Sequence, residues 1–236
     1  MTGLAREDFG IAPDGSRVER VTLSGGGLTL RLIGWGAVVQ DLRLAGHEQP
    51  LVLGFEEFAH YPAHSPYFGA TAGRYANRIR DGRFTLDGVE HQLDRNFLGK
   101  HMLHGGSHGL GRRNWQFTEV TNDHAVLEIT DRDGEMGFPG TCQLRATFSL
   151  PGDGVMAIRY EGASDKPTLL NLAHHSYFNL GGENILGHEI MIDAPSYLPV
   201  DEELIPTGEV APVAGTGHDF RTMRVSMKDR EEGDDD

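Results

Sequence analysis

The chain has 236 residues, 38% of them hydrophobic, and a formal net charge of −14. A chain of this length and apolar content can bury a sizeable core, as one large β domain or as two small ones. The strong negative charge repels phosphate groups, so nucleic acid and acidic membranes are excluded as expected partners.

We expect no segment that would direct the chain out of the cytoplasm. The single cysteine, Cys142, cannot form an internal disulfide. The first residues have no positively charged region followed by an apolar run, so no signal peptide is expected. No segment approaches the ~18 consecutive apolar residues of a membrane-spanning helix. The sequence therefore predicts a soluble, cytoplasmic protein.

The regular patterns along the chain are those of β-strands. Residues 28–32 alternate apolar and polar side chains, as a half-buried strand does. Two further alternating runs, residues 84–86 and 89–93, flank Asp87-Gly88, a pair that tolerates the positive φ of a tight hairpin turn. Later strands are predicted at residues 115–120, 125–130, 142–150 and 155–160.

These elements predict an all-β fold. No window has the pattern of an amphipathic helix of four turns, and short strands separated by turns are typical of a sandwich or barrel. No repeat or linker divides the chain, so we expect a single domain over residues 1–225. Residues 226–236 are rich in acidic side chains that cannot bury apolar surface, which predicts a disordered tail.

Two segments in the first half of the chain could carry a binding site. In Gly-Arg-Tyr-Ala-Asn-Arg-Ile at residues 73–79, Asn77 and Arg78 together supply several hydrogen-bond donors, although an ordinary surface loop fits the same pattern. His104 is followed by Gly105-Gly106, on backbone that a substrate can approach closely. Taken alone, a structural histidine fits that pattern as well.

A third segment, residues 171–182, is rich in polar groups for a stretch with apolar neighbours. It contains the adjacent pair His174 and His175. Consecutive side chains of a strand point to opposite faces, so at most one of the two can face a given pocket. The other is expected to be structural.

No metal ion or other cofactor is expected. His101, His104 and His108 have the spacing of metal ligands on a helix, but Gly105-Gly106 argues against a helix there. The chain has neither a His-Glu-x-x-His sequence nor the His-x-His pair of a cupin-like metal barrel. Its glycine clusters match neither Gly-x-Gly-x-x-Gly nor a P-loop.

Five segments together resemble the aldose 1-epimerase family. They are the residues 73–79 with the hairpin that follows, Leu-His-Gly-Gly at 103–106, DGEMGFPG at 133–140, HHSYFNLGG at 174–182, and the segment 197–221. They occur in the family's order and with its spacing. The resemblance implies the galactose mutarotase-like supersandwich of antiparallel strands, which agrees with the strand patterns.

The resemblance also implies an activity, the interconversion of the α and β anomers of free hexoses such as galactose and glucose. The anomeric hydroxyl loses its proton, the ring oxygen gains one, and the ring opens and recloses on the other face. His175 matches the family's general acid toward the ring oxygen, and His104 matches a second histidine near that oxygen. Histidine, with a pKa near ~6.5, can give and take a proton at neutral pH.

The remaining motif residues are implied to bind the sugar. Asn77 and Arg78 match the family pair that holds sugar hydroxyls. Ser176 and Tyr177 lie beside the acid and are expected to line the pocket. The expected partner is a small-molecule aldose.

The sequence departs from the family pattern near its end. Family members continue past the Asp-Phe-Arg motif at residues 219–221 with an Asp that binds sugar hydroxyls and a Glu that acts as the base, and neither motif is found here. Glu135 and Glu202 are the first candidates for a substitute base. We therefore expect a sandwich that is incomplete at its C-terminal end, with open strand edges, and little or no epimerase activity from residues 1–236 alone.

Three functions stay open at this point. One is an aldose 1-epimerase that is truncated or completed by another polypeptide. Another is a sugar-binding or regulatory relative that keeps His104, His175 and Arg78 but lacks the base. The last is a related epimerase for phosphorylated or otherwise modified sugars, which the negative charge and the close match to the free-sugar motifs disfavour.

Overall fold

The computed structural model describes residues 6–64 and 67–225. The chain divides into two compact units, Met1–Phe178 and Asn179–Asp236, which are described separately below. The expectation of one domain over residues 1–225 stays a prediction, and the expected disordered tail at 226–236 lies outside the described residues. None of the helices in the described ranges is long and apolar enough to cross a membrane.

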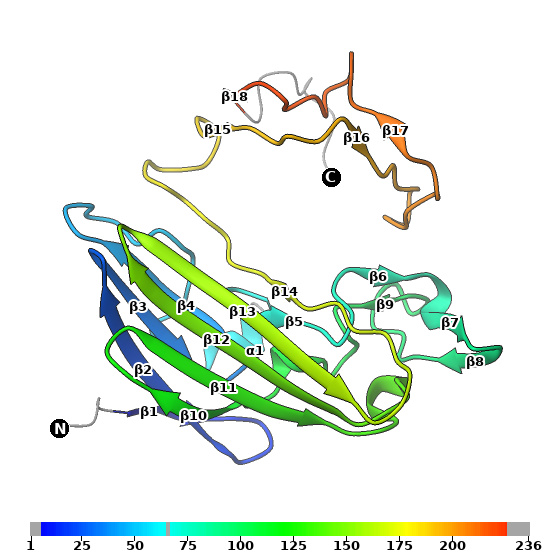
Figure 1. Ribbon diagram of the computed structural model, residues 1–236, viewed down its shortest axis with the longest axis horizontal. Coiled ribbons are helices and arrows are strands. Elements are labelled where there is room, and N and C mark those ends of the chain that lie inside the picture. The colour runs from blue at the N-terminus through cyan, green and yellow to red at the C-terminus, as the bar shows by residue number, and fades with distance from the viewer. Residues whose placement is uncertain (1–5, 65–66, 226–236) are drawn as a thin grey trace. The chain divides into compact units, whose positions relative to one another are not determined.

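The first unit contains a four-stranded antiparallel sheet in the order β1-β2-β3-β4 (Figure 1). Its strands are β1 (Glu7–Ile11), β2 (Arg17–Gly25), β3 (Leu28–Ile33) and β4 (Val38–Leu44). In β3 the predicted alternation is confirmed, because Leu28, Leu30 and Leu32 are buried and the residues between them are half-buried. Gly26 and Gly27 connect β2 to β3 with positive φ angles of 56° and 82°.

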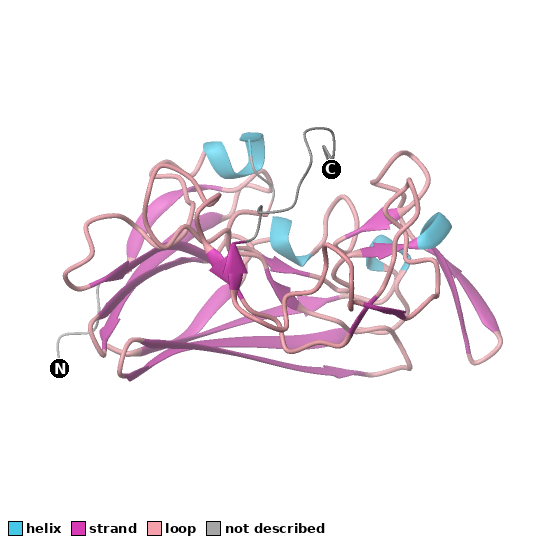
Figure 2. Cartoon of the chain, turned by 90° about the horizontal axis from the view of Figure 1, so that it is seen from above, coloured by secondary structure: helices cyan, strands magenta, loops and turns pink. Residues whose placement is uncertain are grey.

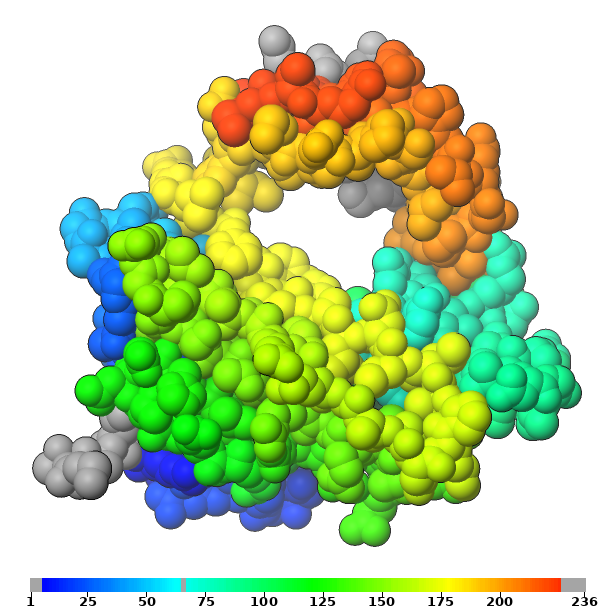
Figure 3. All heavy atoms as spheres, viewed as in Figure 1, coloured from blue at the N-terminus to red at the C-terminus, as the bar shows by residue number. Residues whose placement is uncertain are grey.

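A second antiparallel sheet has the order β10-β11-β12-β13. Its strands are β10 (Gln116–Val120), β11 (His124–Asp131), β12 (Cys142–Gly152) and β13 (Val155–Ser164), which form a continuous green to yellow-green surface in Figure 3. Strand β12 buries alternate residues, from Cys142 to Leu150. All four strands were predicted to within four residues at either end, because their alternation is regular.

The two sheets contribute to one hydrophobic core. Leu23 and Leu30 from the first sheet and Leu127 and Phe148 from the second are fully buried in the same cluster. Burial of a side chain of this size stabilises the fold by about 1.5–3 kcal/mol. The all-β sandwich predicted from the sequence is therefore confirmed.

Short ladders and single helical turns complete the first unit, as Figure 2 shows. The ladders pair β5 (Thr71–Ala72) with β14 (Ala173–His174), β6 (Arg78–Ile79) with β9 (Met102–Leu103), and β7 (Arg83–Leu86) with β8 (Val89–Gln92). The helical turns are α1 (His60–His64), η1 (Arg80–Gly82), η2 (Leu110–Arg112) and η3 (Glu135–Gly137). The hairpin β7–β8 turns at Asp87 and Gly88, with φ angles of 50° and 79°, as its sequence predicts.

The second unit has little regular structure. Its strands β15 (Glu189–Ile190) and β18 (Arg224–Val225) pair with each other, as do β16 (Ser196–Tyr197) and β17 (Ala211–Pro212). Among its described residues, only Ile205, Ala211 and Val213 are buried apolar side chains.

Candidate functional site

His175 is positioned by the ladder between β5 and β14. His174 pairs with Thr71 at the end of this ladder. The next residue, His175, donates its backbone N–H to the carbonyl of Ala70 at 2.9 Å and accepts from the backbone N–H of Gly69 at 3.1 Å. The backbone that carries the predicted acid is thus held on both sides.

His104 and Asn77 face each other where the ladder between β6 and β9 ends, one residue beyond the pair Arg78 and Leu103. Both residues have left-handed backbones, with φ angles of 50° and 64°. Non-glycine residues rarely adopt this conformation, and when they do they are often at functional sites. Two hydrogen bonds join them: the backbone N–H of His104 donates to the Asn77 carbonyl at 3.0 Å, and the Asn77 N–H donates to Nδ1 of His104 at 3.0 Å.

The bond from Asn77 fixes the tautomer of His104. Because Nδ1 accepts a hydrogen bond, the neutral ring carries its proton on Nε2. Burial, followed by the nearby charges of His175 and Arg78, lowers the pKa of His104 to about 4. At neutral pH, His104 is therefore an uncharged donor through Nε2–H.

The two predicted histidines lie in ring contact. Their centroids are 5.0 Å apart and their planes are nearly perpendicular, at 89°. The ring of Tyr67 contacts both, at 4.6 Å from His104 and 5.5 Å from His175. Tyr177 lies 5.1 Å from His175, so four rings form a histidine–tyrosine cluster: Tyr67, His104, His175 and Tyr177.

Arg78 and Asn77 adjoin this cluster. Arg78 donates from Nη1 to Oδ1 of Asn77 at 3.1 Å, and its guanidinium carbon lies 4.5 Å from the centre of the Phe97 ring. The buried Nε of Arg78 has no hydrogen-bond partner within the described part of the chain. The Arg78 side chain is thus held by the side-chain amide of Asn77 and the ring of Phe97.

His174 points away from the cluster. His174 packs against the core ring of Phe148, with 6.4 Å between the centroids, whereas His175 contacts Tyr67 and His104. This agrees with the prediction that only one of the adjacent histidines can face a pocket. Neither ring nitrogen of His174, nor the hydroxyl of Ser176, has a hydrogen-bond partner in the described ranges, and all three atoms are buried.

Arg74, the other arginine of the 73–79 segment, is structural. It is 1% exposed and donates from Nε to Oδ2 of Asp131 at 2.7 Å. Its Nη1 donates to the backbone carbonyls of Pro139 and Gly140 at 2.8 and 2.9 Å. The second half of the DGEMGFPG motif therefore serves to bind this buried arginine.

Gly105 is required by packing within the chain. Its φ is +87°, and a Cβ atom there would lie 1.8 Å from the carbonyl oxygen of Gly73. The sequence suggested that a substrate approaches the backbone at the two glycines after His104. At Gly105 the chain's own backbone occupies that space instead.

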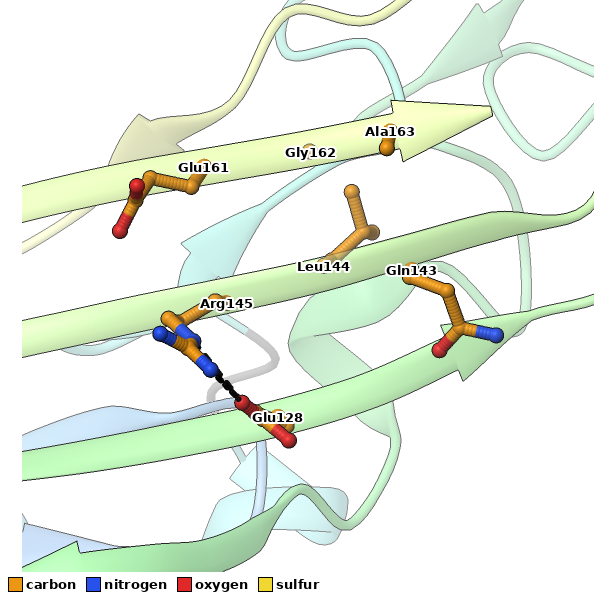
Figure 4. Close-up of a pocket in the computed structure, with 7 residues that line it drawn as sticks. All are labelled: Glu128, Gln143, Leu144, Arg145, Glu161, Gly162 and Ala163. Carbon is orange, nitrogen blue, oxygen red and sulfur yellow. Dashed lines mark hydrogen bonds and ion pairs between the residues drawn. The ribbon is translucent and has the colours of Figure 1, made fainter. Parts of the chain in front are cut away.

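A hollow of about 310 Å³ on the second sheet does not belong to the cluster (Figure 4). Its lining comes from β11, β12 and β13 and includes an ion pair between Arg145 and Glu128, with Nη2 and Oε1 2.6 Å apart. Both side chains are more than a third exposed. Exposed cross-strand pairs of this kind contribute little stability and suggest no chemistry.

The residues considered for a metal site are not grouped in space. Within residues 6–64 and 67–225, no three His, Cys, Asp or Glu side chains come close enough to hold a metal ion. His101 is buried, and its Nδ1 accepts the backbone N–H of Asp81 at 2.8 Å. It therefore stabilises the turn at Asp81.

The sequence patterns missed two aromatic residues of the site. Tyr67 and Phe97 lie in irregular segments without periodicity, and neither belongs to a motif used above. Their contacts with His104, His175 and Arg78 become visible only in three dimensions.

Comparison with known proteins shows the family of the chain. The family model described as Aldose 1-epimerase matches residues 19–235. This chain belongs to the aldose 1-epimerase family. It is 41% identical over 228 residues to the galactose mutarotase of Sus scrofa, and 36% identical over 230 residues to the aldose 1-epimerase of Haemophilus influenzae. Each match covers 94% of this chain.

Solved structures of epimerase homologues share the fold. The GalM/aldose epimerase homologue from C. elegans superposes with a TM-score of 0.85 at 30% identity, over 91% of this chain and 68% of that chain. Galactose 1-epimerase from Lactobacillus acidophilus gives the same TM-score at 29% identity, over 98% and 70%. The chain spans 66% of the length of the Sus scrofa relative and 67% of that from Haemophilus influenzae.

Proposed function

We propose that this chain binds free aldoses such as galactose and glucose and supplies the acid of an aldose 1-epimerase reaction. The observation that carries the proposal is the contact between His104 and His175, whose rings are perpendicular and 5.0 Å apart. In this arrangement two imidazoles can reach one sugar oxygen from different directions. Membership in the family, whose relatives are named galactose mutarotase and aldose 1-epimerase, agrees with it.

In the proposed mechanism His175 is the general acid. It gives its proton to the ring oxygen while a base takes the proton of the anomeric hydroxyl. The bond from the anomeric carbon to the ring oxygen then breaks and a carbonyl forms. After rotation the new hydroxyl adds to the other face of the carbonyl and returns its proton to His175, while the base gives its proton back to the carbonyl oxygen, which becomes the anomeric hydroxyl again. His104, a neutral donor through Nε2–H, steadies the ring oxygen during both steps.

The remaining predicted residues are proposed to hold the sugar. Arg78 and Asn77 are linked to each other and lie next to His104, where their polar groups can bind hydroxyls. Tyr177 is 42% exposed and offers a ring face beside His175. Ser176 contributes through its backbone position beside the acid, since its hydroxyl is buried.

The proposed mechanism also needs a base that takes the proton of the anomeric hydroxyl. Neither imidazole has a carboxylate hydrogen-bond partner among the described residues. In the first unit, Glu135 is the carboxylate to mutate first, because it lines a hollow of about 570 Å³ together with Ser107 and His108, just after the His104 loop. In the second unit the corresponding candidate is Glu202.

We further propose a cytoplasmic location and activity without a metal ion. The location is supported by Cys142, a free and buried thiol. The absence of a metal requirement is supported by the acid–base nature of the reaction, which histidine can serve at neutral pH. Sugar binding that is lost in EDTA and restored by zinc would contradict the second proposal.

Two measurements on the 236-residue chain test the proposed function. Titration with α-D-galactose, followed by ligand-observed NMR, should show binding that weakens in His104→Ala and Arg78→Ala. Polarimetry of freshly dissolved sugar should show that His175→Ala lowers any enzymatic rate by about 10²–10⁴-fold. Arg145→Ala, which changes only the hollow of Figure 4, is the matched control. Binding and rate equal to wild type in all three site variants would contradict the proposal.

A further inference from the structure

Tyr67 lies in the turn that leads into the ladder positioning His175. Its carbonyl accepts the backbone N–H of Ala70 at 3.1 Å, which closes a turn. The last two residues of that turn, Gly69 and Ala70, exchange the backbone hydrogen bonds with His175. The placement of the Tyr67 ring is therefore tied to the backbone of the proposed acid.

The ring of Tyr67 touches both histidines. Its plane meets that of His104 edge-on, at 63° and 4.6 Å, and lies roughly parallel to that of His175, at 29° and 5.5 Å. These distances and angles are those of favourable aromatic pairs. Together with the contact of 5.0 Å between the histidines, they close a triangle of three rings.

The two histidines need this ring to different degrees. His104 is already held, because its Nδ1 accepts a hydrogen bond from the backbone of Asn77. The imidazole of His175 makes no hydrogen bond within the described ranges, so packing against Tyr67, His104 and Tyr177 sets its orientation. Tyr177 is 42% exposed, whereas Tyr67 is half-buried and also contacts His104.

We propose that Tyr67 is a positioning residue. Its ring holds the imidazole of His175 at right angles to that of His104, so that both imidazoles can hydrogen-bond to one atom of a ligand. The consequence for catalysis rests on the function proposed above; the consequence for the geometry of the two rings does not. The effect belongs to the ring and not to the hydroxyl. Burial raises the pKa of that hydroxyl, which stays protonated at neutral pH.

The test compares Tyr67→Phe, which keeps the ring, with Tyr67→Leu and Tyr67→Met, which remove it. The primary measurement is the nuclear Overhauser effect between the ring protons of His104 and His175 in the full chain without sugar. Wild type should also show effects from the Tyr67 ring to both imidazoles. We expect the contact between the histidines to persist in Tyr67→Phe and to be lost in Tyr67→Leu and Tyr67→Met.

The matched control is Tyr197→Leu. Tyr197 contacts a histidine in the second unit, His218, at 4.3 Å. Removing its ring should leave the contact between His104 and His175 unchanged. An unchanged contact in Tyr67→Leu and Tyr67→Met, or a wild-type spectrum without effects from Tyr67 to both rings, would overturn the proposal. The wild-type spectrum decides the question even if the substitutions unfold the chain.

A kinetic measurement separates this inference from the proposed function. Misplacement of a reacting group by about 1 Å can cost roughly 100-fold in rate. Tyr67→Leu should therefore lower kcat by about 10–100-fold with a smaller change in KM, and Tyr67→Phe should stay near wild type. If wild type neither binds sugar nor accelerates mutarotation, the proposed function fails while the ring contacts still decide the role of Tyr67. If wild type is active and Tyr67→Leu equals it, only the positioning role fails.

Discussion

The two compact units of the chain bury their apolar side chains to different extents. The first unit has strands of up to eleven residues and contains all three clusters of buried apolar side chains found among the described residues. The strands of the second unit are two residues long. Of the nineteen exposed large apolar side chains in the described ranges, ten lie in residues 179–225, which is about a fifth of the chain.

The difference shows what long alternating strands achieve. In β12, each second residue from Cys142 to Leu150 enters the core, so a single strand buries five side chains. A two-residue strand offers at most one side chain to each face. The first unit can therefore stabilise a site on short loops such as the one at His104, while local turns dominate the second unit.

Buried and exposed ion pairs give the sharpest test of this comparison. Arg74→Met removes one of the two arginine partners of Asp131, which is 4% exposed, and should destabilise the fold by about 3–5 kcal/mol. Because Arg113 also pairs with Asp131, we expect a loss near the lower end of this range. The measurement is the midpoint of urea denaturation.

The matched variant in the second unit is Arg221→Met. Arg221 pairs with Asp219 at 2.7 Å, but its side chain is 44% exposed and that of Asp219 is 28% exposed. Exposed pairs contribute little, so no change in the midpoint is expected. Equal losses in the two variants would show that burial does not distinguish the units.

Leucine truncation tests the core itself. Leu127 in β11 is fully buried, and Leu127→Ala should cost about 2–5 kcal/mol through lost apolar contact and the cavity left behind. Leu198 in the second unit is 60% exposed, and Leu198→Ala should change stability by less than about 0.5 kcal/mol. Urea denaturation of both variants measures the difference. A large loss in Leu198→Ala would mean that this side chain is covered in solution.

The sequence predicted the strands that have regular patterns. It identified β10 to β13 and the hairpin β7–β8, because their side chains alternate. It did not identify β4, in which Gln40 and Asp41 are buried along with their apolar neighbours, so no alternation is visible. It did not identify β2, where burial is irregular.

The candidate site was predicted through motif resemblance more than through local pattern. His104, His175, Asn77 and Arg78 lie together as expected, but their mutual geometry depends on two short ladders far apart in sequence. Local sequence also cannot tell a buried structural arginine from a binding one. Arg74 and Arg78 are four residues apart, and the difference between them arises from the carbonyls of a loop some sixty residues away.

The pH dependence of stability offers a smaller test, centred on His174. Burial, followed by the charge of His175, lowers the pKa of His174 to about 4 from its usual 6.5. The unfolded chain therefore binds a proton at His174 between pH 6.5 and 4, whereas the folded chain does not. The free energy of unfolding therefore keeps its full value above pH 6.5 and decreases as the pH falls toward 4. The decrease due to His174 is up to about 3 kcal/mol.

His174→Phe should flatten this part of the profile. The ring nitrogens of His174 are buried without hydrogen-bond partners in the described part of the chain, so an apolar ring beside Phe148 removes a desolvation cost and the titration together. Part of the slope of unfolding free energy against pH remains in His174→Phe, because the pKa of His104 is also lowered to about 4.

The control is Asp219→Asn in the second unit. The Arg221 side chain lowers the pKa of Asp219 to about 2, so the stability that the ionised Asp219 contributes is lost only below pH 3.8. Asp219→Asn should therefore leave the profile between pH 6.5 and 4 unchanged. Urea denaturation of wild type, His174→Phe and Asp219→Asn at intervals between pH 7 and pH 4 measures these profiles. A His174→Phe profile as steep as that of wild type would show that another group causes the loss of stability in acid.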